Sequence, residues 1–350
     1  MKQRVLVTGG AGFIGSAVVR HLISQTECNV LTLDKLTYAG HLASLGEAHQ
    51  HPRHEFVEGD VADESLVNSV FKSFQPEWVM HLAAESHVDR SIEGPRAFVE
   101  SNVLGTATLL DASLHHWRAL PDDRRDGFRF LQVSTDEVFG SLGEQGRFHA
   151  ESPYRPNSPY SASKAAADHL VRAWHRTYGL PVLTTHCSNN YGPYQYPEKL
   201  IPLMIHNGVA GLPLPVYGTG NQVRDWLHVE DHVAALIAVL QRGRPGRTYC
   251  IGAETELCNL ELIQRLCAYL DSLRPDSGHV PHASLIRHVT DRPGHDQRYA
   301  IDNTTIREEI GWTPYRSLED GLRETAQWYL DNGDWVRTVL PTRSETDCSS

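Results

Sequence analysis

The first half of the chain alternates short apolar runs with longer segments that carry apolar residues on one face. The apolar runs predict buried β-strands at residues 4–9, 29–34, 54–60, 77–84, 128–134 and 182–188. The intervening amphipathic segments predict helices, among them residues 13–25, 64–74 and 105–117. Strands that alternate with helices are typical of βαβ units. The pattern therefore predicts an α/β fold with a doubly wound parallel sheet.

The alternation of strands and helices weakens after Asn189, where Pro and Gly become more frequent. We predict a first lobe over residues 1–188 and a smaller C-terminal α/β lobe over residues 189–340, mainly for substrate binding. The segment at about residues 224–242 is expected to return to the first lobe. Residues 341–350 show no periodicity, so we expect a disordered tail there.

Composition and charge exclude several classes of protein. The 350 residues, 40% of them hydrophobic, are enough for one large domain or two intimate ones. A net charge of −11 argues against a general nucleic-acid surface, which needs clustered Lys and Arg. No apolar run approaches the length of a membrane span, and the chain enters a strand without a signal peptide. The six cysteines form no C-x-x-C pair, so we interpret them as reduced thiols of a cytoplasmic protein.

The turn after the first predicted strand is the first candidate site. Gly9, Gly12 and Gly15 follow the strand in "RVLVTGGAGFIGS" and open an apolar helix. Glycines permit a tight turn and a close backbone approach, and the helix N-terminus can receive a pyrophosphate. The second strand ends at Asp34, which can bind both ribose hydroxyls and would repel a 2′-phosphate. An ordinary βα turn is the alternative, but these parts in this order predict a Rossmann-type NAD site.

Two charged residues flank this predicted site. Lys35 follows Asp34 directly and slightly weakens the preference for NAD over NADP. Asp60 closes the run "FVEGD" after the third strand, where it can contact the adenine side of a dinucleotide. A loop carboxylate without a function is the alternative for Asp60. We therefore predict NAD as the cofactor.

A tyrosine and a lysine stand one helical turn apart further along the chain. Ser158 is an expected N-cap, Pro159 is at the first helical position, and Gly179 ends the helix. Tyr160 and Lys164 are then i and i+4 on one face. A nearby ammonium lowers the pKa of a phenol from about 10 toward working pH. Such a phenol can take the proton of a sugar hydroxyl while hydride leaves the carbon, although the same spacing is also a frequent accident on helices.

Two adjacent carboxylates follow the fifth predicted strand in "STDEVFG". Asp136 and Glu137 come directly after Ser134 and Thr135. Carboxylates this close push their pKa values apart, which leaves one protonated and one ionised. Such a pair can serve as a general acid and a general base, and the spacing does not say which residue has which task. The alternative is that Asp136 caps a turn and Glu137 is solvated.

The second half of the chain contains candidate phosphate-binding and metal-binding residues. Arg224 in "QVRDWLHVED" and Arg292 in "DRPGH" are candidates for bidentate phosphate contacts. His228 and His232 are spaced i, i+4, which can hold zinc on a helix. No third ligand is suggested by the sequence, so we expect no metal.

The motifs together resemble a known family. The glycine turn, "HLAAESHVDRS", Thr135 with Tyr160 and Lys164, "CSNNYGP" and "DRPGHD" are similar to the extended short-chain dehydrogenase/reductase superfamily. Within it, "STDEVFG", "DKLTYAG" and "RDWLHVEDH" resemble the dTDP-glucose 4,6-dehydratases, and the resemblance runs from about residue 3 to residue 338. It implies oxidation of the sugar at C4, elimination of water across C5 and C6, and return of the hydride to C6. The net reaction is redox-neutral, so NAD is expected to stay bound.

The resemblance also implies roles for individual residues. Asp136 would be the general acid toward the C6 oxygen, Glu137 the base at C5, and Thr135 a hydrogen-bond partner of the C4 hydroxyl beside Tyr160. Further cofactor contacts would be Phe13, Ile14, Lys35, Leu36, Thr37, Val61, Leu82, Ala83, Ala84, Ser101 and Asn190. Further nucleotide-sugar contacts would be Ser86, Asn189, Lys199, Leu200, Pro215, Val216, Tyr217, Asn259, Asp291 and His295, besides Arg224 and Arg292.

A homodimer is expected from the same resemblance, through helices at about residues 97–117 and 159–177. These segments carry apolar residues beyond one face, namely Trp117, Leu170, Val171 and Trp174.

Three other functions remain open at this point. A nucleotide-sugar 4-epimerase or decarboxylase shares the fold, NAD, the tyrosine and the lysine, but an epimerase needs no acid and base for elimination. A dehydratase for another nucleotide sugar differs only in loops that bind the base and sugar. A catalytically inactive, cofactor-sensing binding protein would be expected to lack Tyr160 or Lys164, and both are present.

Overall fold

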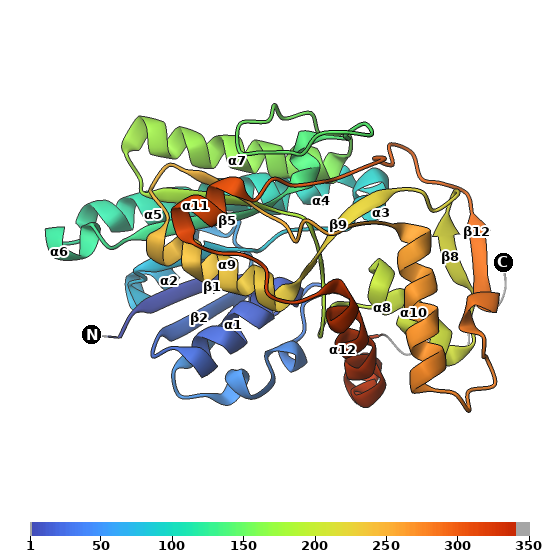
Figure 1. Ribbon diagram of the computed structural model, residues 1–350. Helices are drawn as coiled ribbons and strands as arrows, with labels where there is room; N and C mark the ends of the chain where they lie inside the picture. Colours follow the sequence, from blue (N-terminus) through green and yellow to red (C-terminus); the bar gives the residue numbers. More distant parts are fainter. Residues whose placement is uncertain (1, 341–350) are drawn as a thin grey trace.

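The computed structural model, which describes residues 2–340, has a seven-stranded sheet at its centre (Figure 1). Every neighbouring pair of strands in this sheet is parallel, in the order β10-β6-β5-β4-β1-β2-β3. The predicted α/β class with a doubly wound parallel sheet is therefore confirmed. The strands are β1 (Arg4–Thr8), β2 (Asn29–Asp34), β3 (His54–Glu58), β4 (Trp78–His81), β5 (Arg129–Thr135), β6 (Val182–Cys187) and β10 (Thr248–Ile251). The tail predicted at residues 341–350 lies outside the described residues.

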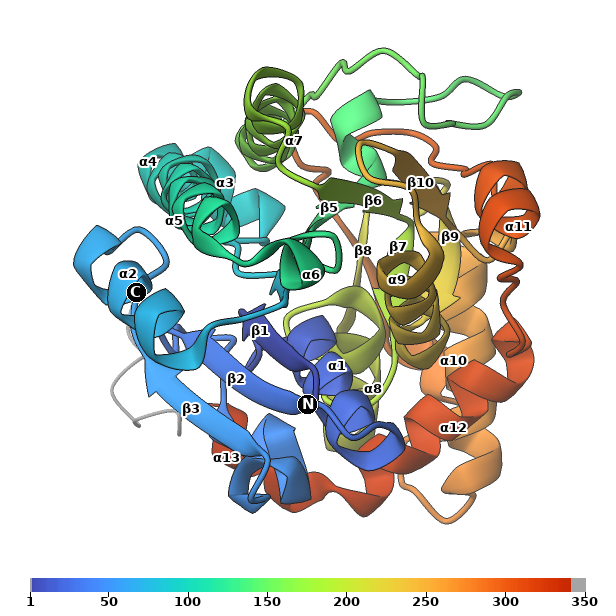
Figure 2. The same ribbon diagram turned by 90° about the vertical axis from the view of Figure 1, so that its left-hand side faces the viewer.

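Helices cover both faces of this sheet (Figure 2). One face is covered by α1 (Phe13–Gln25), α9 (Val229–Arg242) and α11 (Thr304–Ile310). The other face is covered by α2 (Glu64–Phe74), α5 (Gly105–Ala119) and α7 (Pro159–Tyr178). Each face has its own apolar core, and central strand residues such as Leu6 and Val7 are fully buried in opposite cores. Because both faces are covered, the strands read as continuous apolar runs rather than alternating ones.

The predicted helix over residues 159–178 begins and ends as the sequence indicates. Ser158 is the N-cap, and its hydroxyl accepts from the backbone N–H of Ser161 while the Ser161 hydroxyl contacts the Ser158 backbone in return. Pro159 is at the first helical position, and Gly179 follows the helix in the left-handed conformation with a φ of +77°. This reciprocal cap fixes the first turn of α7, where Tyr160 lies.

The segment before α5 is less regular than the sequence predicts. The helix predicted at residues 105–117 is α5, but residues 97–117, expected as a helix of the dimer interface, are not one continuous α-helix. They are divided among α4 (Pro95–Phe98), the π-helical turn η2 (Val99–Leu104) and α5. The short helix α3 (Val88–Glu93) precedes α4, and α6 (Asp122–Arg125) follows α5. A π-helical turn widens the backbone spiral, and such turns are frequent at functional sites.

A second apolar core lies beside the carboxyl ends of the large sheet. A three-stranded sheet orders β11 (Glu256–Cys258), β9 (Val223–His228) and β7 (Asn189–Tyr191), and β8 (Leu214–Tyr217) pairs in parallel with β12 (Ile286–Val289). The helices packed here are α8 (Leu200–Ala210), α10 (Asn259–Leu273), α12 (Leu318–Asp331) and α13 (Gly333–Val339). The 3-10 helices are η1 (Leu42–Gln50), η3 (Asp136–Phe139) and η4 (His282–Leu285). The chain crosses between the two cores more than once, and the lobe boundaries given above stay a prediction.

Strand β10 was missed by the sequence patterning. Its four residues are bounded by polar and glycine residues, which makes the apolar run too short to stand out. It pairs with β6 at the edge of the large sheet and follows α9. Residues 229–251 therefore lie on the large sheet, further along the chain than the predicted return. Among residues 2–340, no helix has the length and apolar character that crossing a bilayer would need.

Candidate active site

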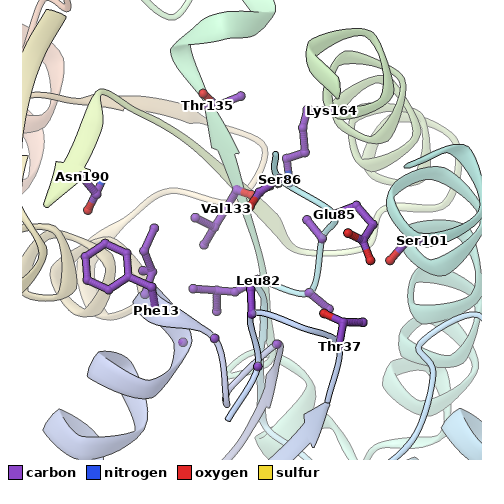
Figure 3. A pocket seen from close by; sticks show the side chains of 18 of the residues that line it. Phe13, Thr37, Leu82, Glu85, Ser86, Ser101, Val133, Thr135, Lys164 and Asn190 are labelled. Carbon is purple, nitrogen blue, oxygen red and sulfur yellow. Dashed lines mark hydrogen bonds between the residues drawn. The ribbon is translucent and has the colours of Figure 1, made fainter. Parts of the chain in front are cut away.

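The carboxyl ends of five neighbouring strands open into one pocket (Figure 3). Gly9 follows β1, Asp34 ends β2, Leu82 follows β4, Thr135 ends β5 and Cys187 ends β6, and all five line the pocket. Ligands of open α/β sheets bind at this edge, because the loops that follow parallel strands gather there.

The glycine turn after β1 leaves no room for side chains. Gly9 has a φ of +70°, a left-handed conformation that L side chains rarely adopt. A Cβ at Gly15 would lie 2.1 Å from the Gly9 carbonyl oxygen. The N-cap of α1 is Gly12, which has no side chain to cap the helix, so the first N–H groups face the pocket edge. A backbone turn with uncapped N–H groups fits the pyrophosphate of a dinucleotide.

Asp34 lines the pocket at the end of β2, where the ribose of a dinucleotide is expected. Its carboxylate accepts hydrogen bonds from the backbone N–H groups of Ala11 and Leu36, both at 2.9 Å. Burial raises the pKa of Asp34, and these two hydrogen bonds oppose the rise. The carboxylate is thus held rigidly at the end of β2, where a 2′-phosphate would meet its charge.

Lys35 and Asp60 form a pair beside this carboxylate. Lys35 Nζ lies 3.4 Å from Asp60 Oδ2, and Asp60 Oδ1 accepts from the backbone N–H of Ala62 at 2.9 Å. Asp60 therefore offsets the lysine charge that weakened the sequence-based preference for NAD. Lys35 lines the pocket, whereas Asp60 and Leu36 do not.

The other residues expected at the cofactor gather around the same space. Figure 3 shows Phe13 and Asn190 on one side of it and Ser101 on the other. The expected cofactor residues that line the pocket are Gly9, Gly12, Phe13, Ile14, Gly15, Asp34, Lys35, Thr37, Val61, Leu82, Ala83, Ala84, Ser101, Tyr160, Lys164 and Asn190.

Tyr160 and Lys164 enter the pocket from α7, and both are buried. Lys164 Nζ donates to the backbone carbonyl of Val133 at 2.8 Å, which ties the helix to β5. The expected lowering of the tyrosine pKa is not found. Burial raises the pKa of Tyr160 well above 10, with Glu137 adding to the rise and Thr135 opposing it. Burial also lowers the pKa of Lys164, because it disfavours the charged ammonium. The lysine charge therefore does not offset the effect of burial on the pKa of Tyr160.

Asp136 and Glu137 lie in η3, directly after β5, and both line the pocket. Asp136 is 1% exposed, and its Oδ1 accepts a long 3.4 Å hydrogen bond from the Thr135 hydroxyl. Its Oδ2 is buried and has no hydrogen-bond partner among the described residues. Burial raises the pKa of Asp136 well above its usual range, and the charges of Glu137 and Asp225 raise it further. The protonated form of Asp136 is therefore favoured, and its Oδ2 is not used by another described residue.

Glu137 has different surroundings. Burial raises its pKa as well, but the cations Arg292, Lys199 and Arg224 oppose the rise. The pKa values of the two carboxyl groups are pushed apart, as expected for neighbours, and Asp136 is the more strongly raised of the two. The arrangement can supply an acid, a base and a phenol to one bound molecule.

The expected nucleotide-sugar residues fall into two groups. Ser86, Thr135, Asn189 and Lys199 line the pocket, and Lys199 Nζ donates to the Ser86 carbonyl at 3.0 Å. The others lie outside the lining, namely Leu200, Pro215, Val216, Tyr217, Arg224, Asn259, Asp291, Arg292 and His295. Val216 is buried in the core of the second group of elements. Asn259 begins α10, and its Oδ1 is buried without a hydrogen-bond partner among the described residues.

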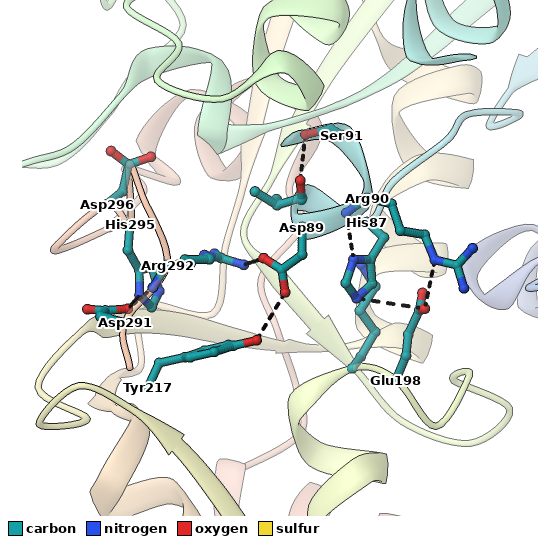
Figure 4. Close-up of polar contacts among 12 residues, drawn as sticks. His87, Asp89, Arg90, Ser91, Glu198, Tyr217, Asp291, Arg292, His295 and Asp296 are labelled. Carbon is teal, nitrogen blue, oxygen red and sulfur yellow. Dashed lines mark hydrogen bonds and ion pairs between the residues drawn. The ribbon is translucent and has the colours of Figure 1, made fainter. Parts of the chain in front are cut away.

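The two candidate arginines are held by protein groups. Arg292 Nη1 lies 3.2 Å from Asp89 Oδ1, and Tyr217 donates to the other oxygen of Asp89 at 3.1 Å (Figure 4). Arg224 is buried, donates to the carbonyls of Val223 and Asp296, and lies 4.3 Å from the centre of the Tyr299 ring.

His295 is paired with the carboxylate of Asp291 at 2.6 Å (Figure 4). Histidines at 228 and 232 were the metal candidates. His228 caps α9, and His232 Nδ1 contacts Asn190 Oδ1 at 2.9 Å. Within residues 2–340 no cluster of three or more His, Cys, Asp or Glu side chains could hold a metal ion.

Several pocket residues were missed by sequence reasoning. Glu85, Tyr196 and Glu198 line the pocket. Glu85 follows directly after the β4 loop "HLAA", so its place in the chain was a usable signal. Asn102 holds its backbone, accepting from Glu85 N–H at 2.8 Å and donating to Ser163 on α7. Glu198 directly precedes Lys199, which the resemblance implied as a substrate contact, so its place in the chain was also a usable signal.

Comparisons with known proteins agree with this geometry. A profile described as GDP-mannose 4,6 dehydratase matches residues 6–325. A dTDP-glucose 4,6-dehydratase of Xanthomonas campestris pv. campestris is 57% identical over 335 residues, which cover 96% of this chain and 95% of the relative.

Solved structures give the same result. A dTDP-glucose 4,6-dehydratase of Streptomyces venezuelae with NAD bound has a TM-score of 0.87 at 45% identity, covering 97% of this chain and all of the other. One from Bacillus anthracis, in complex with NAD, has a TM-score of 0.84 at 42% identity with the same coverage.

Proposed function

The chain belongs to the GDP-mannose 4,6-dehydratase family, and from this premise we propose that it is a dTDP-glucose 4,6-dehydratase. It is a hydro-lyase that converts dTDP-glucose to dTDP-4-keto-6-deoxyglucose and water. NAD is the cofactor, and when bound it accepts a hydride from C4 and returns it at C6. The single observation that carries the proposal is the Asp136–Glu137 pair in the same pocket as Tyr160 and Lys164.

The chemistry explains why one site needs all four side chains. The C5 proton of glucose is barely acidic, so water cannot be eliminated directly across C5 and C6. A ketone at C4 makes C5 the α-carbon of a carbonyl, and a base can then remove its proton. Tyr160 takes the proton of the C4 hydroxyl during this oxidation, with the Thr135 hydroxyl beside it.

The two carboxyl groups then carry out the elimination. Glu137 is the base at C5, because three cations favour its ionised form. Asp136 protonates the departing C6 hydroxyl, because burial keeps it protonated and its Oδ2 has no partner within the described residues. A positioned acid or base contributes roughly 10²–10⁴ in rate.

Tyr160 must be a phenolate to accept the C4 hydroxyl proton, and a cationic neighbour favours that form at working pH. Its pKa is raised well above 10 by burial in the protein alone. Lys164 is one helical turn away and is the cation that α7 supplies. We place the loss of the Tyr160 proton in the loaded site, where the charge of the oxidised nicotinamide adds to that of the lysine.

We assign the nucleotide diphosphate to the cations whose charges act on Glu137, of which Lys199 lines the pocket and the two arginines do not. Arg292 and Arg224 are the bidentate candidates, with Lys199 as a third cation. Arg292 Nε is buried without a hydrogen-bond partner among the described residues, so this N–H of the guanidinium group is not used by them. Arg292 exchanges Asp89 for a phosphate oxygen when substrate binds.

The proposal includes a homodimer in the cytoplasm. Val99 and Leu104, both in η2, are about half exposed, as is Tyr178 at the end of α7. These residues support a helix–helix interface at the expected place. Val171, which was expected to contribute, is fully buried in the core under α7 and does not contribute. The five described cysteines are unpaired, which fits a reducing compartment.

The test is to incubate the purified protein with dTDP-glucose, UDP-glucose, GDP-mannose and dTDP-galactose, to read loss of water by mass, and to distinguish the 4-epimers, which have equal mass, by NMR. Loss of one water from dTDP-glucose, faster than from the other sugars, supports the proposal. Loss of water only from another nucleotide sugar moves the assignment to that dehydratase. Conversion of dTDP-galactose to dTDP-glucose without loss of water would instead identify a 4-epimerase.

A further inference from the structure

A buried polar cluster lies between α7 and the strands β5 and β6, and only its member Ser134 lines the pocket. At its centre is Asp168, one helical turn after Lys164 on α7 and 4% exposed. Asp168 Oδ2 accepts from the Ser134 hydroxyl at 2.7 Å and from the Tyr154 hydroxyl at 3.2 Å. His186 Nε2, on β6, lies 3.0 Å from the same oxygen. These contacts come from β5, β6 and the loop before α7, so Asp168 joins three parts of the chain.

The cluster is next to the reacting groups at two points. Ser134 directly precedes Thr135, Asp136 and Glu137 in the chain. Lys164 is the i−4 neighbour of Asp168 on α7. Lys164 Nζ also donates to the Val133 carbonyl at 2.8 Å, one residue before Ser134. The ammonium and the carboxylate therefore hold α7 to the end of β5 from both sides.

A buried ammonium needs a counter-charge, because burial alone favours the neutral amine. Burial is the main cause that lowers the pKa of Lys164, and the charge of Asp168 is the largest opposing cause. The other titratable groups around the lysine are neutral: burial raises the pKa of Cys187 to about 12 and lowers that of His81 to about 3. Tyr160, on the same helix, has its pKa raised by burial and is also neutral.

The groups that face Asp168 all contact its Oδ2, whereas its Oδ1 is buried without a hydrogen-bond partner among the described residues. Tyr154 has its pKa raised above the ordinary range by burial and by Asp168, so it is a neutral donor. His186 Nδ1 is buried with no hydrogen-bond partner among the described residues. The Tyr154 hydroxyl also lies 2.9 Å from His186 Nε2, so the hydroxyl, the imidazole and the carboxyl group form one hydrogen-bonded group. Two hydroxyls and one imidazole directed at one oxygen fit a carboxylate as the acceptor.

We propose that Asp168 is a positioning residue that holds the Lys164 ammonium in its charged form and fixes α7 against the catalytic end of β5. It acts on the reaction through Lys164 and Ser134 and does not touch the substrate. The inference rests on the proposed function, because it assigns Asp168 a part in activating the Tyr160–Lys164 pair.

The test uses Asp168→Asn, which keeps the size and an acceptor oxygen but removes the charge. The alkaline limb of kcat/KM should move to lower pH by roughly one unit, because Lys164 loses its proton more easily. Tyr154→Phe is the matched control, since it removes one hydrogen bond to Asp168 and leaves the charge. The alkaline limb of Tyr154→Phe should lie at the same pH as that of the unmodified enzyme. The limb of Asp168→Glu should lie closer to that pH than the limb of Asp168→Asn does.

A second readout is independent of activity. The chain has only five lysines, so ¹³Cε-lysine labelling allows Lys164 to be titrated by NMR after assignment with Lys164→Arg. In the unmodified protein Lys164 should be an ammonium at pH 8, and its midpoint should fall in Asp168→Asn. A neutral amine at pH 8 in the unmodified protein would overturn the inference, even if Asp168→Asn does not fold. So would a midpoint and an alkaline limb that are both unchanged in Asp168→Asn.

The two proposals can fail separately. If the unmodified protein does not dehydrate dTDP-glucose but the NMR midpoint of Lys164 shifts as expected, the proposed function is wrong and the role of Asp168 in the lysine charge stands. If the protein dehydrates dTDP-glucose but neither the limb nor the midpoint moves, only the role of Asp168 is wrong.

Discussion

Asp136 and Glu137 are adjacent residues with different surroundings. Asp136 turns into a buried space with one long hydrogen bond, whereas Glu137 lies within reach of three cations. The sequence predicted that the pair would titrate apart but could not say which member would be the acid. Arg224, Arg292 and Lys199 are all more than 60 positions from Glu137 in the chain, so only the fold brings their charges to it.

The pKa of Tyr160 was predicted wrongly for the same reason, because the order of residues does not give their surroundings in the fold. Sequence spacing places the Lys164 ammonium near the phenol, but it says nothing about how deeply both groups are buried. Burial penalises both the phenolate and the ammonium, and it is the largest cause of both pKa shifts.

The first prediction separates the oxidation from the elimination. Asp136→Asn and Glu137→Gln keep size and hydrogen bonding but cannot exchange protons. Both variants should still reduce the bound cofactor on adding dTDP-glucose, while loss of water falls by roughly 10²–10⁴. Stopped-flow absorbance of the reduced nicotinamide, run beside mass analysis of the sugar, measures both. Tyr160→Phe is the matched control and should lose both activities. Native rates of water loss in Glu137→Gln would show that the role given to this residue is wrong.

The second prediction concerns stability and pH. The pKa of Asp136 is raised above its unfolded value, so its contribution to stability is present at low pH and is lost as pH rises toward the folded pKa. Asp136→Asn removes this loss and should raise the Tm at pH 8 by about 2 °C or more, with a smaller gain at pH 5. Calorimetric melts at the two pH values measure the difference.

A carboxylate with the opposite shift provides the control. Hydrogen bonding to Arg247 lowers the pKa of Glu309 to about 2. Its contribution to stability is present above the unfolded pKa and is lost as pH falls toward 2, so Glu309→Gln should lower the Tm at pH 8. An Asp136→Asn variant that is less stable than the unmodified protein at pH 8 would contradict the assignment of Asp136 as a buried, protonated acid.

At the scale of elements, the regular parts of the first lobe could be predicted and the irregular parts could not. The helices over residues 13–25 and 64–74 have the predicted bounds, because their apolar periodicity is long and their ends carry glycine or an Asp63 N-cap. The π-helical turn η2 has helical periodicity in sequence and differs only in backbone hydrogen bonding. Strand β10 is four residues long, and its partner β6 is about sixty positions earlier, so tertiary pairing defines it.

The third prediction concerns the start of α7. Ser158→Ala removes the side-chain half of the capping box and should lower the free energy of unfolding by about 1 kcal/mol. Because Tyr160 lies in the first turn of this helix, kcat should fall as well. Ser317→Ala is the matched control, since Ser317 caps α12 in the same way through Asp320 N–H. It should cost a similar free energy in urea unfolding and leave kcat within a factor of two. Equal kcat losses in both variants would mean that the cap affects only global stability.

At the scale of the whole molecule, the substrate-binding residues were the hardest part to predict. Gly9, Asp34, Thr135 and Tyr160 lie at strand ends or helix starts, and parallel topology brings such positions to one edge. Arg292 and Tyr217 lie in loops and short strands whose positions depend on packing between distant segments. Their contacts with Asp89 could not be read from the order of residues.

The fourth prediction concerns assembly. Leu104 in η2 is 55% exposed, and Val209 in α8 is 41% exposed on another part of the molecule. Leu104→Glu should convert the expected dimer to a monomer, because a charge would be buried at the proposed interface. Val209→Glu should leave the dimer intact. Light scattering on both variants at micromolar concentration measures the mass, and a monomeric unmodified protein would contradict the proposed interface.

The most direct measurement of the central claim follows one hydrogen atom through a single turnover. The protein is mixed with less than one equivalent of dTDP-[4-²H]glucose in ordinary water, and the product is read by mass and NMR. We predict a product that is one water lighter, with the deuterium at C6 and no reduced nicotinamide left at the end. The Asp136–Glu137 pair and Tyr160 are all needed for that outcome. Deuterium left on the nicotinamide, or returned to C4 without loss of water, would show that the enzyme is a dehydrogenase or an epimerase and that the account is wrong.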